Sequence, residues 1–363
     1  MRVLGIETSC DETAVGICEL ANNKVNMLSN SVVSQIDIHR EFGGVVPEIA
    51  ARSHIEAIIP TIEASLRSAF GTDRTKMAWS EVDAIAVTYG AGLGGALLMG
   101  TMTARALALV KQKPLYGANH VLGHVYANFI TGQSGVMDTA LPERAPEFPL
   151  LALIVSGKHS QIAYFRDHFD YDVLGVTRDD AIGEAFDKVA KMTGLPYPGG
   201  PSVARAAESG NPGAFHLPKP KLDDPYETSY SGLKTAVLRK AQMLCGRDHT
   251  TPSFELPGLL SAQQVNDIAA VFQKTAIEMM VEKMVRACND LPVKDVVIAG
   301  GVASSQELRR QLTAALPIEP IYTDPRLCTD NGAMIASLGC YMAASGRPTA
   351  NPSSLQIAPS LRM

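Results

Sequence analysis

The feature that most constrains the fold of this 363-residue chain is a pattern that occurs twice. Residues 2–20 form a strand, a polar turn and a second strand, and residues 150–165 repeat this arrangement. Further along the chain, each hairpin is followed by a buried strand, a glycine turn and a helix, first at residues 84–95 and again from residue 296. The duplication predicts two similar α/β halves that face each other across a cleft.

Such a duplication is typical of the superfamily that contains actin, the sugar kinases and the heat-shock ATPases. We therefore expect a two-lobed, actin-like α/β fold with lobes at residues 1–117 and 118–331. A helix at about 332–345 would pack back on the first lobe, and a helical insertion at about 167–290 would interrupt the second. The tail at 346–363 is rich in proline and serine and is expected to fray. Fold alone does not fix function.

Composition and charge indicate in which cellular compartment the protein works and whether it contacts RNA or a membrane. The net charge of −5 gives no global basic field, so any contact with RNA must be local. The six cysteines are scattered without a Cys-x-x-Cys motif, which favours a reducing compartment such as the cytoplasm. Residues 91–110 are apolar but contain Arg105 and several glycines, so they predict a buried helix and not a membrane span. Candidates for local RNA backbone contacts are Lys219, Lys221, Lys234, Arg239 and Lys240.

Two histidines four residues apart, His120 and His124, are a candidate metal site. On a helix, positions i and i+4 share a face, so both imidazoles could bind one ion. The peptidase pattern His-Glu-x-x-His is excluded because Val121 stands where the activating glutamate is needed. Alternatively, the histidines only pack or cap a helix. Asp330 opens a helix of small residues and is either its N-cap or a ligand for a metal.

The glycine and acid motifs leave several interpretations open. Residues 90–95 match Gly-x-Gly-x-x-Gly, but no acid follows within residues 96–137 to bind a ribose, so dinucleotide binding is disfavoured. Asp11 and Glu12 lie in the first hairpin turn and either project toward the cleft or cap the turn. Asp187 is either a cleft acid or part of a helix surface.

Six segments between Met1 and Tyr341 carry a resemblance to a known family. They are Gly5-Ile-Glu-Thr-Ser-Cys-Asp-Glu-Thr13, Gly43-Gly-Val-Val-Pro-Glu48, Gly183-Glu-Ala-Phe-Asp-Lys188, Tyr197-Pro-Gly-Gly-Pro201, Ser231-Gly-Leu-Lys-Thr235 and Cys328-Thr-Asp-Asn-Gly-Ala-Met334. In combination they make the chain similar to the TsaD family, the tRNA N6-adenosine threonylcarbamoyltransferases, in its bacterial or mitochondrial form. Members of this family were once described as glycoproteases.

The resemblance implies an acyltransferase. It would move the threonylcarbamoyl group from threonylcarbamoyl-AMP to N6 of the adenosine 3′ of the anticodon, in tRNAs that read codons beginning with A. The family's single divalent ion, Fe²⁺ or Zn²⁺, would fall on His120, His124 and Asp330. The implied partners are tRNA, a paralogous actin-like subunit and a small P-loop ATPase (TsaB- and TsaE-like), with no membrane.

The resemblance also places the donor nucleotide. The family's nucleotide contacts correspond to Ile154, Val155, Ser156, Gly157, Lys158, Asp187, Gly200 and Ser305. We add Gly300 and Gly301 of the second glycine turn to these candidates. We hypothesise that Asp11 or Glu12 accepts the proton that leaves N6 during transfer.

Three positions depart from the family pattern. Lys158 replaces a glycine in the second hairpin turn, Ser305 replaces an asparagine, and Leu122 stands where a glutamate is common between the histidines. These departures motivate one alternative, a catalytically weakened member that serves as a nucleotide- or partner-binding subunit. A further alternative is a carbamoyltransferase that acts on another acceptor.

Overall fold

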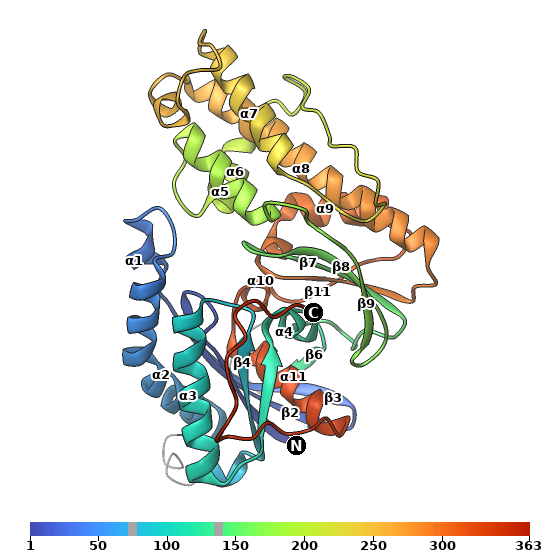
Figure 1. Cartoon of the computed structure of the whole chain (residues 1–363). Coiled ribbons are helices and arrows are strands. Elements are labelled where there is room, and N and C mark those ends of the chain that lie inside the picture. The colour runs from blue at the N-terminus through green and yellow to red at the C-terminus, as the bar shows by residue number, and fades with distance from the viewer. Residues whose placement is uncertain (72–77, 134–140) are drawn as a thin grey trace. The chain divides into compact units, whose positions relative to one another are not determined.

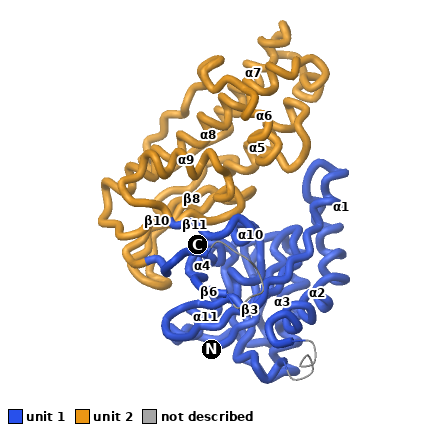
Figure 2. The backbone as a smooth tube through the Cα atoms, turned by 180° about the vertical axis from the view of Figure 1, so that it is seen from behind, with its two compact units in different colours: residues 1–146, 321–363 blue, residues 147–320 orange. Residues whose placement is uncertain are grey.

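The computed structural model of the chain describes residues 1–71, 78–133 and 141–363 (Figure 1). It forms two compact units, which are coloured separately in Figure 2. Unit 1 contains residues 1–146 and 321–363, and unit 2 contains residues 147–320. Unit 2 is therefore inserted into the sequence of unit 1.

Unit 1 is built on a six-stranded sheet with the order β5-β4-β1-β2-β3-β6. Its strands are β1 (Arg2–Glu7), β2 (Glu12–Ala21), β3 (Lys24–Ser34), β4 (Ala84–Gly90), β5 (Leu115–Asn119) and β6 (Ile130–Gln133). The first three pair as antiparallel hairpins, whereas β4 and β5 run parallel to β1. The hairpin and the parallel strands meet at β1, which is central in the sheet.

The second sheet repeats this pairing scheme in the order β11-β10-β7-β8-β9. Its strands are β7 (Leu150–Val155), β8 (Ser160–Asp167), β9 (Asp170–Val176), β10 (Asp295–Ala299) and β11 (Ile321–Tyr322). As in the first sheet, three strands form an antiparallel meander and the next strand in sequence pairs in parallel with the first. The predicted fold class, an α/β chain with duplicated actin-like halves, is confirmed.

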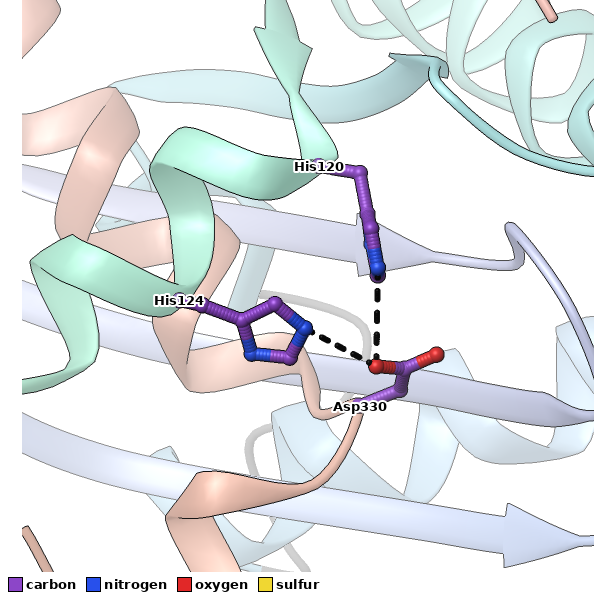
Figure 3. A group of neighbouring side chains, drawn as sticks. All are labelled: His120, His124 and Asp330. Carbon is purple, nitrogen blue, oxygen red and sulfur yellow. Dashed lines mark ion pairs between the residues drawn. The ribbon is translucent and has the colours of Figure 1, made fainter. Parts of the chain in front are cut away.

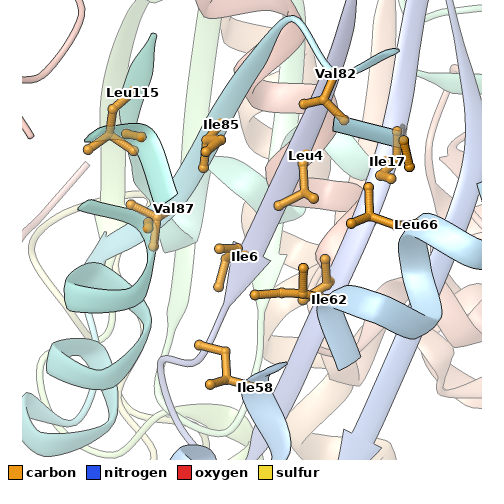
Figure 4. Close-up of a cluster of buried hydrophobic side chains, with 14 residues drawn as sticks. Leu4, Ile6, Ile17, Ile58, Ile62, Leu66, Val82, Ile85, Val87 and Leu115 are labelled. Atoms are coloured by element: carbon orange, nitrogen blue, oxygen red, sulfur yellow. The ribbon is translucent and has the colours of Figure 1, made fainter. Parts of the chain in front are cut away.

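Helices cover both faces of the first sheet. The helical segments of unit 1 are α1 (Ile36–Arg40), α2 (Pro47–Phe70), η2 (Ala78–Glu81), α3 (Gly94–Lys111), α4 (His120–Ala127), α10 (Pro325–Cys328) and α11 (Gly332–Ala344). On one face, Leu4 and Ile6 of β1 pack with Ile62 of α2 in an apolar core that also includes residues of α3 (Figure 4). Because side chains alternate along a strand, the residues between them face the other side of the sheet.

That other side carries glycines where α11 lies against the sheet. Gly5 and Gly16 are directly paired across β1 and β2. A Cβ atom on Gly5 would lie 2.2 Å from the Ala336 backbone nitrogen, and one on Gly16 would lie 2.3 Å from that of Ala333. A side chain at either position would overlap the helix backbone, so the two glycines allow α11 to contact the sheet directly. This contact fixes the N-terminus of α11 beside the first hairpin.

The division into units differs from the expected border at residues 117 and 118. Residues 118–146 belong to unit 1 because β6 pairs with β3 and α4 packs on α11. The chain returns to unit 1 at residue 321, before Asp330. Both histidines and Asp330 are therefore in the same unit.

The C-terminal tail is held in place along its length, so the expectation that it frays was wrong. The backbone nitrogens of Ala350 and Ala358 each donate to a unit 1 carbonyl, at 2.7 Å in both cases. The Arg105 guanidinium donates to the carbonyls of Pro352 and Ser353, both at 2.6 Å. These bonds tie the tail to β4, β5 and α3, which composition alone did not reveal.

Helix α3 is only half buried, whereas its apolar sequence predicted a buried helix. Leu98 and Met102 are 42% and 47% exposed, and Val110 is 75% exposed. The prediction was wrong for this side of the helix. Among the described residues, no helix combines the length and the apolar character that crossing a membrane requires.

Unit 2 carries a mainly helical region between β9 and β10. Its helices, with the two that follow β10, are α5 (Ile182–Thr193), α6 (Gly199–Ala207), α7 (Ser231–Leu244), η3 (Ser253–Gly258), α8 (Ala262–Asp290), η4 (Gly301–Ser304) and α9 (Gln306–Ala315). Helix α6 begins inside the segment Tyr197-Pro-Gly-Gly-Pro201, whose prolines and glycines are typical of a connector. The Asp187 carboxylate accepts the Gly199 N–H at 2.7 Å, which satisfies a free donor at the start of this helix.

Candidate functional site

The two histidines are placed by the first turn of α4. The side-chain oxygen of Asn119 accepts the Val121 N–H at 2.8 Å and caps the helix, which therefore begins at His120. His120 and His124 point to the same side, and their ring centroids are 4.8 Å apart. Between them, Gly123 faces α11, where a Cβ would lie 2.8 Å from the Ile335 side chain. The glycine thus lets α4 lie close to α11.

Asp330 reaches the histidines from the residues just before α11. Its Oδ1 lies 3.2 Å from Nε2 of His124 and 3.6 Å from Nε2 of His120 (Figure 3). The N-cap of α11 is instead Asn331, whose side-chain oxygen accepts the Met334 N–H at 2.9 Å. Asp330 is therefore not the N-cap, and its carboxylate is directed at the two imidazoles.

These three side chains fit a metal ion. Their potential ligand atoms all lie within 4.8 Å of one another. Ligands of one ion at about 2.0–2.2 Å lie about 3–3.5 Å apart, and the separations of 3.2 Å and 3.6 Å between Asp330 and the two imidazoles are close to this. Both ring nitrogens of His124 are buried, and neither forms a hydrogen bond with a described residue, although Nε2 lies 3.2 Å from Asp330. Such unsatisfied buried groups are costly, and a metal would satisfy the Nε2.

Glu7, the last residue of β1, was not predicted as a site residue but supports this cluster. Its buried carboxylate accepts hydrogen bonds from the Ser9 N–H at 2.5 Å and the Thr88 hydroxyl at 2.6 Å. It also lies 3.1 Å from Nδ1 of His120. Burial alone would raise the pKa of Glu7, but the charge and hydrogen bond of His120 bring it below its usual value. A carboxylate in this position orients a histidine whose other nitrogen binds a metal.

Asp11 and Glu12 lie at the same end of the first hairpin. Burial raises the pKa of Glu12 to about 9, and the nearby carboxylates of Asp330, Asp11 and Glu7 add to the shift. The structure therefore brings three other carboxyl groups close enough to disfavour a charge on Glu12. A cation held by the histidines and Asp330 would counter this repulsion.

In unit 2, several predicted nucleotide residues gather where β7 and β10 end. Ile154 and Val155 close β7, and the turn at residues 156–159 leads into β8. Gly300, with φ of +88°, follows β10, and a Cβ there would lie 2.4 Å from the Val155 carbonyl oxygen. Gly301 then begins η4. The two glycine turns are therefore neighbours, and glycine is required at position 300.

The other predicted nucleotide residues reach this region through α5. A Cβ on Gly183, near the start of α5, would lie 2.7 Å from the Ser156 carbonyl oxygen, so the helix abuts the hairpin turn. Asp187, one turn further on, already accepts the Gly199 N–H, and burial raises its pKa. A Cβ on Gly157 or on Gly200 would meet nothing within 4 Å, so both positions have open space. Asp187 thus has a structural role that the sequence did not predict.

Comparison with known proteins decides the family. The family model for TsaD, tRNA N6-adenosine threonylcarbamoyltransferase, matches residues 26–337. The chain belongs to the TsaD family. A relative from Symbiobacterium thermophilum is 46% identical over 95% of this chain and 92% of its own length. A relative from Thermomicrobium roseum is 44% identical over 95% of this chain and 93% of its own. Both are named tRNA N6-adenosine threonylcarbamoyltransferase.

Solved structures that align with this TsaD-family chain are more distant. Component A of the (R)-2-hydroxyglutaryl-CoA dehydratase of Acidaminococcus fermentans is 16% identical, with a TM-score of 0.48 over 95% of this chain and 99% of that one. YeaZ from Pseudomonas aeruginosa is 12% identical, with a TM-score of 0.39 over 98% of both chains.

The three departures of this TsaD-family chain have different surroundings. Ser305 is the N-cap of α9, and its hydroxyl accepts the Leu308 N–H at 3.4 Å, so it serves a role that asparagine also serves. Lys158 is exposed in the turn at 156–159. Leu122 is buried in α4. The substitution at 305 therefore preserves the local helix.

The pKa of Glu12 predicts how pH affects the metal-free protein. A carboxyl with a folded-state pKa near 9 keeps a proton that the unfolded chain releases near pH 4.5. Folding then takes up a proton between these values, so stability falls as pH rises from about 5 to 9. The Glu12→Gln variant should lose this part of the dependence, which is on the order of a few kcal/mol. Urea unfolding of both proteins at pH 6 and pH 9 measures it.

The control is Glu63→Gln, which neutralises an exposed carboxylate on α2 and should follow the wild-type pH dependence. Histidine titration also changes the free energy of unfolding over this pH range. Comparing each variant with the wild type at the same pH removes that contribution. Parallel pH profiles for wild type and Glu12→Gln would contradict the assignment of a raised pKa to this residue.

Proposed function

We propose that this chain transfers a threonylcarbamoyl group to N6 of an adenosine in tRNA. The donor is threonylcarbamoyl-AMP, and the acceptor is the adenosine 3′ of the anticodon in tRNAs that read codons beginning with A. The observation that carries the proposal is the cluster of His120, His124 and Asp330 in a chain of this family. The names of the relatives, which align over 95% of the chain, support the same reaction.

We assign the cluster to one divalent ion, Fe²⁺ or Zn²⁺, held by both imidazoles and the Asp330 carboxylate. When bound, this ion supplies positive charge that polarises the carbonyl of the donor. Glu7 keeps Nδ1 of His120 protonated, so that Nε2 would present its lone pair to the ion. In unit 2, Gly157 and Gly200 have the open space that close approach of the donor nucleotide needs.

In the reaction, a bond forms between N6 and the carbamoyl carbon while the bond from that carbon to the phosphate oxygen breaks. AMP leaves, and N6 loses a proton to a nearby base. Asp11 and Glu12 are our candidates for this base. Burial and the nearby carboxylates raise the pKa of Glu12, and a bound cation would lower it toward the range in which this carboxylate accepts a proton. The amine is a poor nucleophile, so positioning and charge stabilisation provide much of the rate.

Mass spectrometry of tRNA nucleosides tests the proposal. The chain, loaded with Fe²⁺ or Zn²⁺, is incubated with tRNA and threonylcarbamoyl-AMP, with and without its partner proteins. We expect N6-threonylcarbamoyladenosine in tRNAs that read A-starting codons. Its absence under all of these conditions, with donor bound, would favour a weakened binding subunit. Transfer only from carbamoyl phosphate to a small acceptor would favour a carbamoyltransferase.

We propose that the paralogous actin-like partner binds the exposed sides of α2 and α3. Ile55 and Ile59 lie one turn apart on α2 and are 60% and 50% exposed. Leu98 and Met102 have the same spacing on α3, which packs beside α2. Adjacent helices thus carry an apolar surface, which is typical of a protein interface. The small P-loop ATPase would join this pair.

Replacing Ile55 and Met102 with aspartate should prevent this partner from binding, because each change buries a charge at the interface. Affinity purification of the tagged chain from cells that co-express the partner measures the effect, and we expect at least about a tenfold loss of bound partner. The matched control is Phe254→Asp in unit 2, which changes a side chain that is 78% exposed. Equal recovery of the partner with all variants would place the interface elsewhere.

A further inference from the structure

A groove in unit 2 lies between α7 and the segment at residues 216–218. Its volume is about 610 Å³. Leu217, Pro218, Ala236 and Met243 form its apolar lining. The rest of the lining consists of His216, Ser231, Gly232, Thr235, Arg239 and Lys240. The groove is separate from the turns at the ends of β7 and β10 and contains no residue assigned above to the metal or the nucleotide.

The groove is positively charged. Arg239 and Lys240 both line it, and none of the lining residues is acidic. Neither residue forms an ion pair with a described residue, and the Lys240 ammonium lies 4.8 Å from the centre of the Phe215 ring. Arg239 is exposed. In a chain with a net charge of −5, this is a local site where an anion is attracted.

Other basic candidates near the groove are already neutralised. The Lys219 ammonium lies 3.1 Å from Glu278 and 2.5 Å from Glu282. The Lys234 ammonium lies 2.7 Å from Asp180. Lys221 is exposed but is not part of the groove lining. The charges that the groove itself offers to a ligand are therefore those of Arg239 and Lys240.

Helix α7 places Thr235 and Arg239 one turn apart, and both line the groove. The hydroxyl of Ser231, one turn earlier, donates to the Asp179 carboxylate at 2.7 Å, and that of Thr235 donates to the Ser231 carbonyl at 2.9 Å. Both hydroxyls therefore already have acceptors within the chain. The donors that remain for phosphate oxygens are the Arg239 guanidinium and the Lys240 ammonium, and two neighbouring cations on an open groove fit the repeated phosphates of a strand.

Gly232 gives an independent observation. A Cβ at this position would meet nothing within 4 Å, so packing within the chain does not require glycine. Glycine weakens a helix by up to about 1 kcal/mol relative to alanine. Its presence in the first turn of α7 keeps this end of the groove open, as close approach of a ligand backbone requires.

We propose that this groove binds the phosphate backbone of tRNA. The proposal rests on the function proposed above and identifies one surface through which unit 2 holds that substrate. The contacts are to phosphates, so they contribute affinity and orientation and do not select the tRNA sequence. Selection of the anticodon loop must come from other residues.

Filter binding of tRNA at several salt concentrations tests the groove. The double variant Arg239→Ala/Lys240→Ala should bind tRNA on the order of tenfold more weakly at low salt. Because two phosphate contacts are lost, the slope of log affinity against log salt should become shallower by about 2. The control variant Lys283→Ala/Arg286→Ala removes the same charge from α8 of the same unit and should leave affinity and slope unchanged.

A second variant separates the shape of the groove from its charge. Gly232→Leu fills the open end with a good helix former, so α7 should be retained, and thermal unfolding checks this. This variant should weaken tRNA binding while leaving the salt dependence nearly unchanged. Its effect would show that the backbone of the ligand approaches α7 closely.

The outcomes distinguish this proposal from the proposed function. If the wild type modifies tRNA while both groove variants bind tRNA like the wild type, the groove assignment is overturned and the function stands. If the wild type binds tRNA through the groove but forms no modified adenosine, the function fails and the groove stands. Displacement of tRNA from the wild type by poly-glutamate at equal charge concentration would overturn the RNA assignment in favour of an acidic protein.

Discussion

Replacing Asp330 with asparagine is expected to abolish transfer and to weaken metal binding at least about 100-fold. The change keeps the shape of the side chain but removes the only negative charge among the three predicted ligands. It leaves two neutral imidazoles, which hold a divalent ion poorly without an anionic ligand. Competition with a chelator for Zn²⁺ measures the affinity, and nucleoside mass spectrometry measures the transfer.

The control is Asp324→Asn, a few residues earlier in the chain. Asp324 is buried, and its carboxylate caps α10 and contacts Arg326. This variant should lose some stability and keep its metal affinity. If Asp330→Asn binds Zn²⁺ as tightly as the wild type, Asp330 is not a ligand and the assignment of the cluster is wrong.

Glu7→Gln is expected to weaken metal binding about 10- to 100-fold while the protein remains folded. The amide can occupy the same space, but it presents a weaker acceptor to Nδ1 of His120 and no longer offsets the positive charge that builds up on the ring. The proton on this ring is then no longer fixed on Nδ1. Nitrogen NMR of the histidine rings, together with chelator competition, measures the tautomer and the affinity separately.

A buried carboxylate in unit 2 gives the matched control for this experiment. Asp295 is 3% exposed and accepts the Glu147 N–H at 2.7 Å. Asp295→Asn should lower stability through a comparable lost charge, without an effect on Zn²⁺ affinity or on the histidine resonances. If the Glu7→Gln variant keeps the wild-type histidine tautomer and the wild-type Zn²⁺ affinity, Glu7 serves only to pack the end of β1.

The sequence predicted those parts of the molecule that depend on local periodicity. Strand alternation and glycine turns revealed the duplicated halves, and the spacing of His120 and His124 placed both on one side of a helix. Asp330 could not be assigned from spacing, since an N-cap and a ligand have the same sequence signal. Only the structure shows that Asn331 takes the cap.

Glu7 was missed because its role depends on contacts that are distant in the sequence. Its partners, Thr88 and His120, come from β4 and α4, and no local pattern connects them to β1. The available signal was a charged residue directly after the apolar run Val3–Ile6 of this strand. The start of α6 is hard to predict from the sequence for a similar reason. The Asp187 side chain that stabilises it belongs to another helix, α5.

The insertion of unit 2 into unit 1 has a consequence for biosynthesis. The ribosome makes both histidines first, then all of residues 147–320, and only afterwards Asp330 and the helix that follows it. A nascent chain therefore lacks the Asp330 carboxylate until all of unit 2 has been made. We expect loading with metal to be a late step in maturation, and prematurely terminated chains to be released without it.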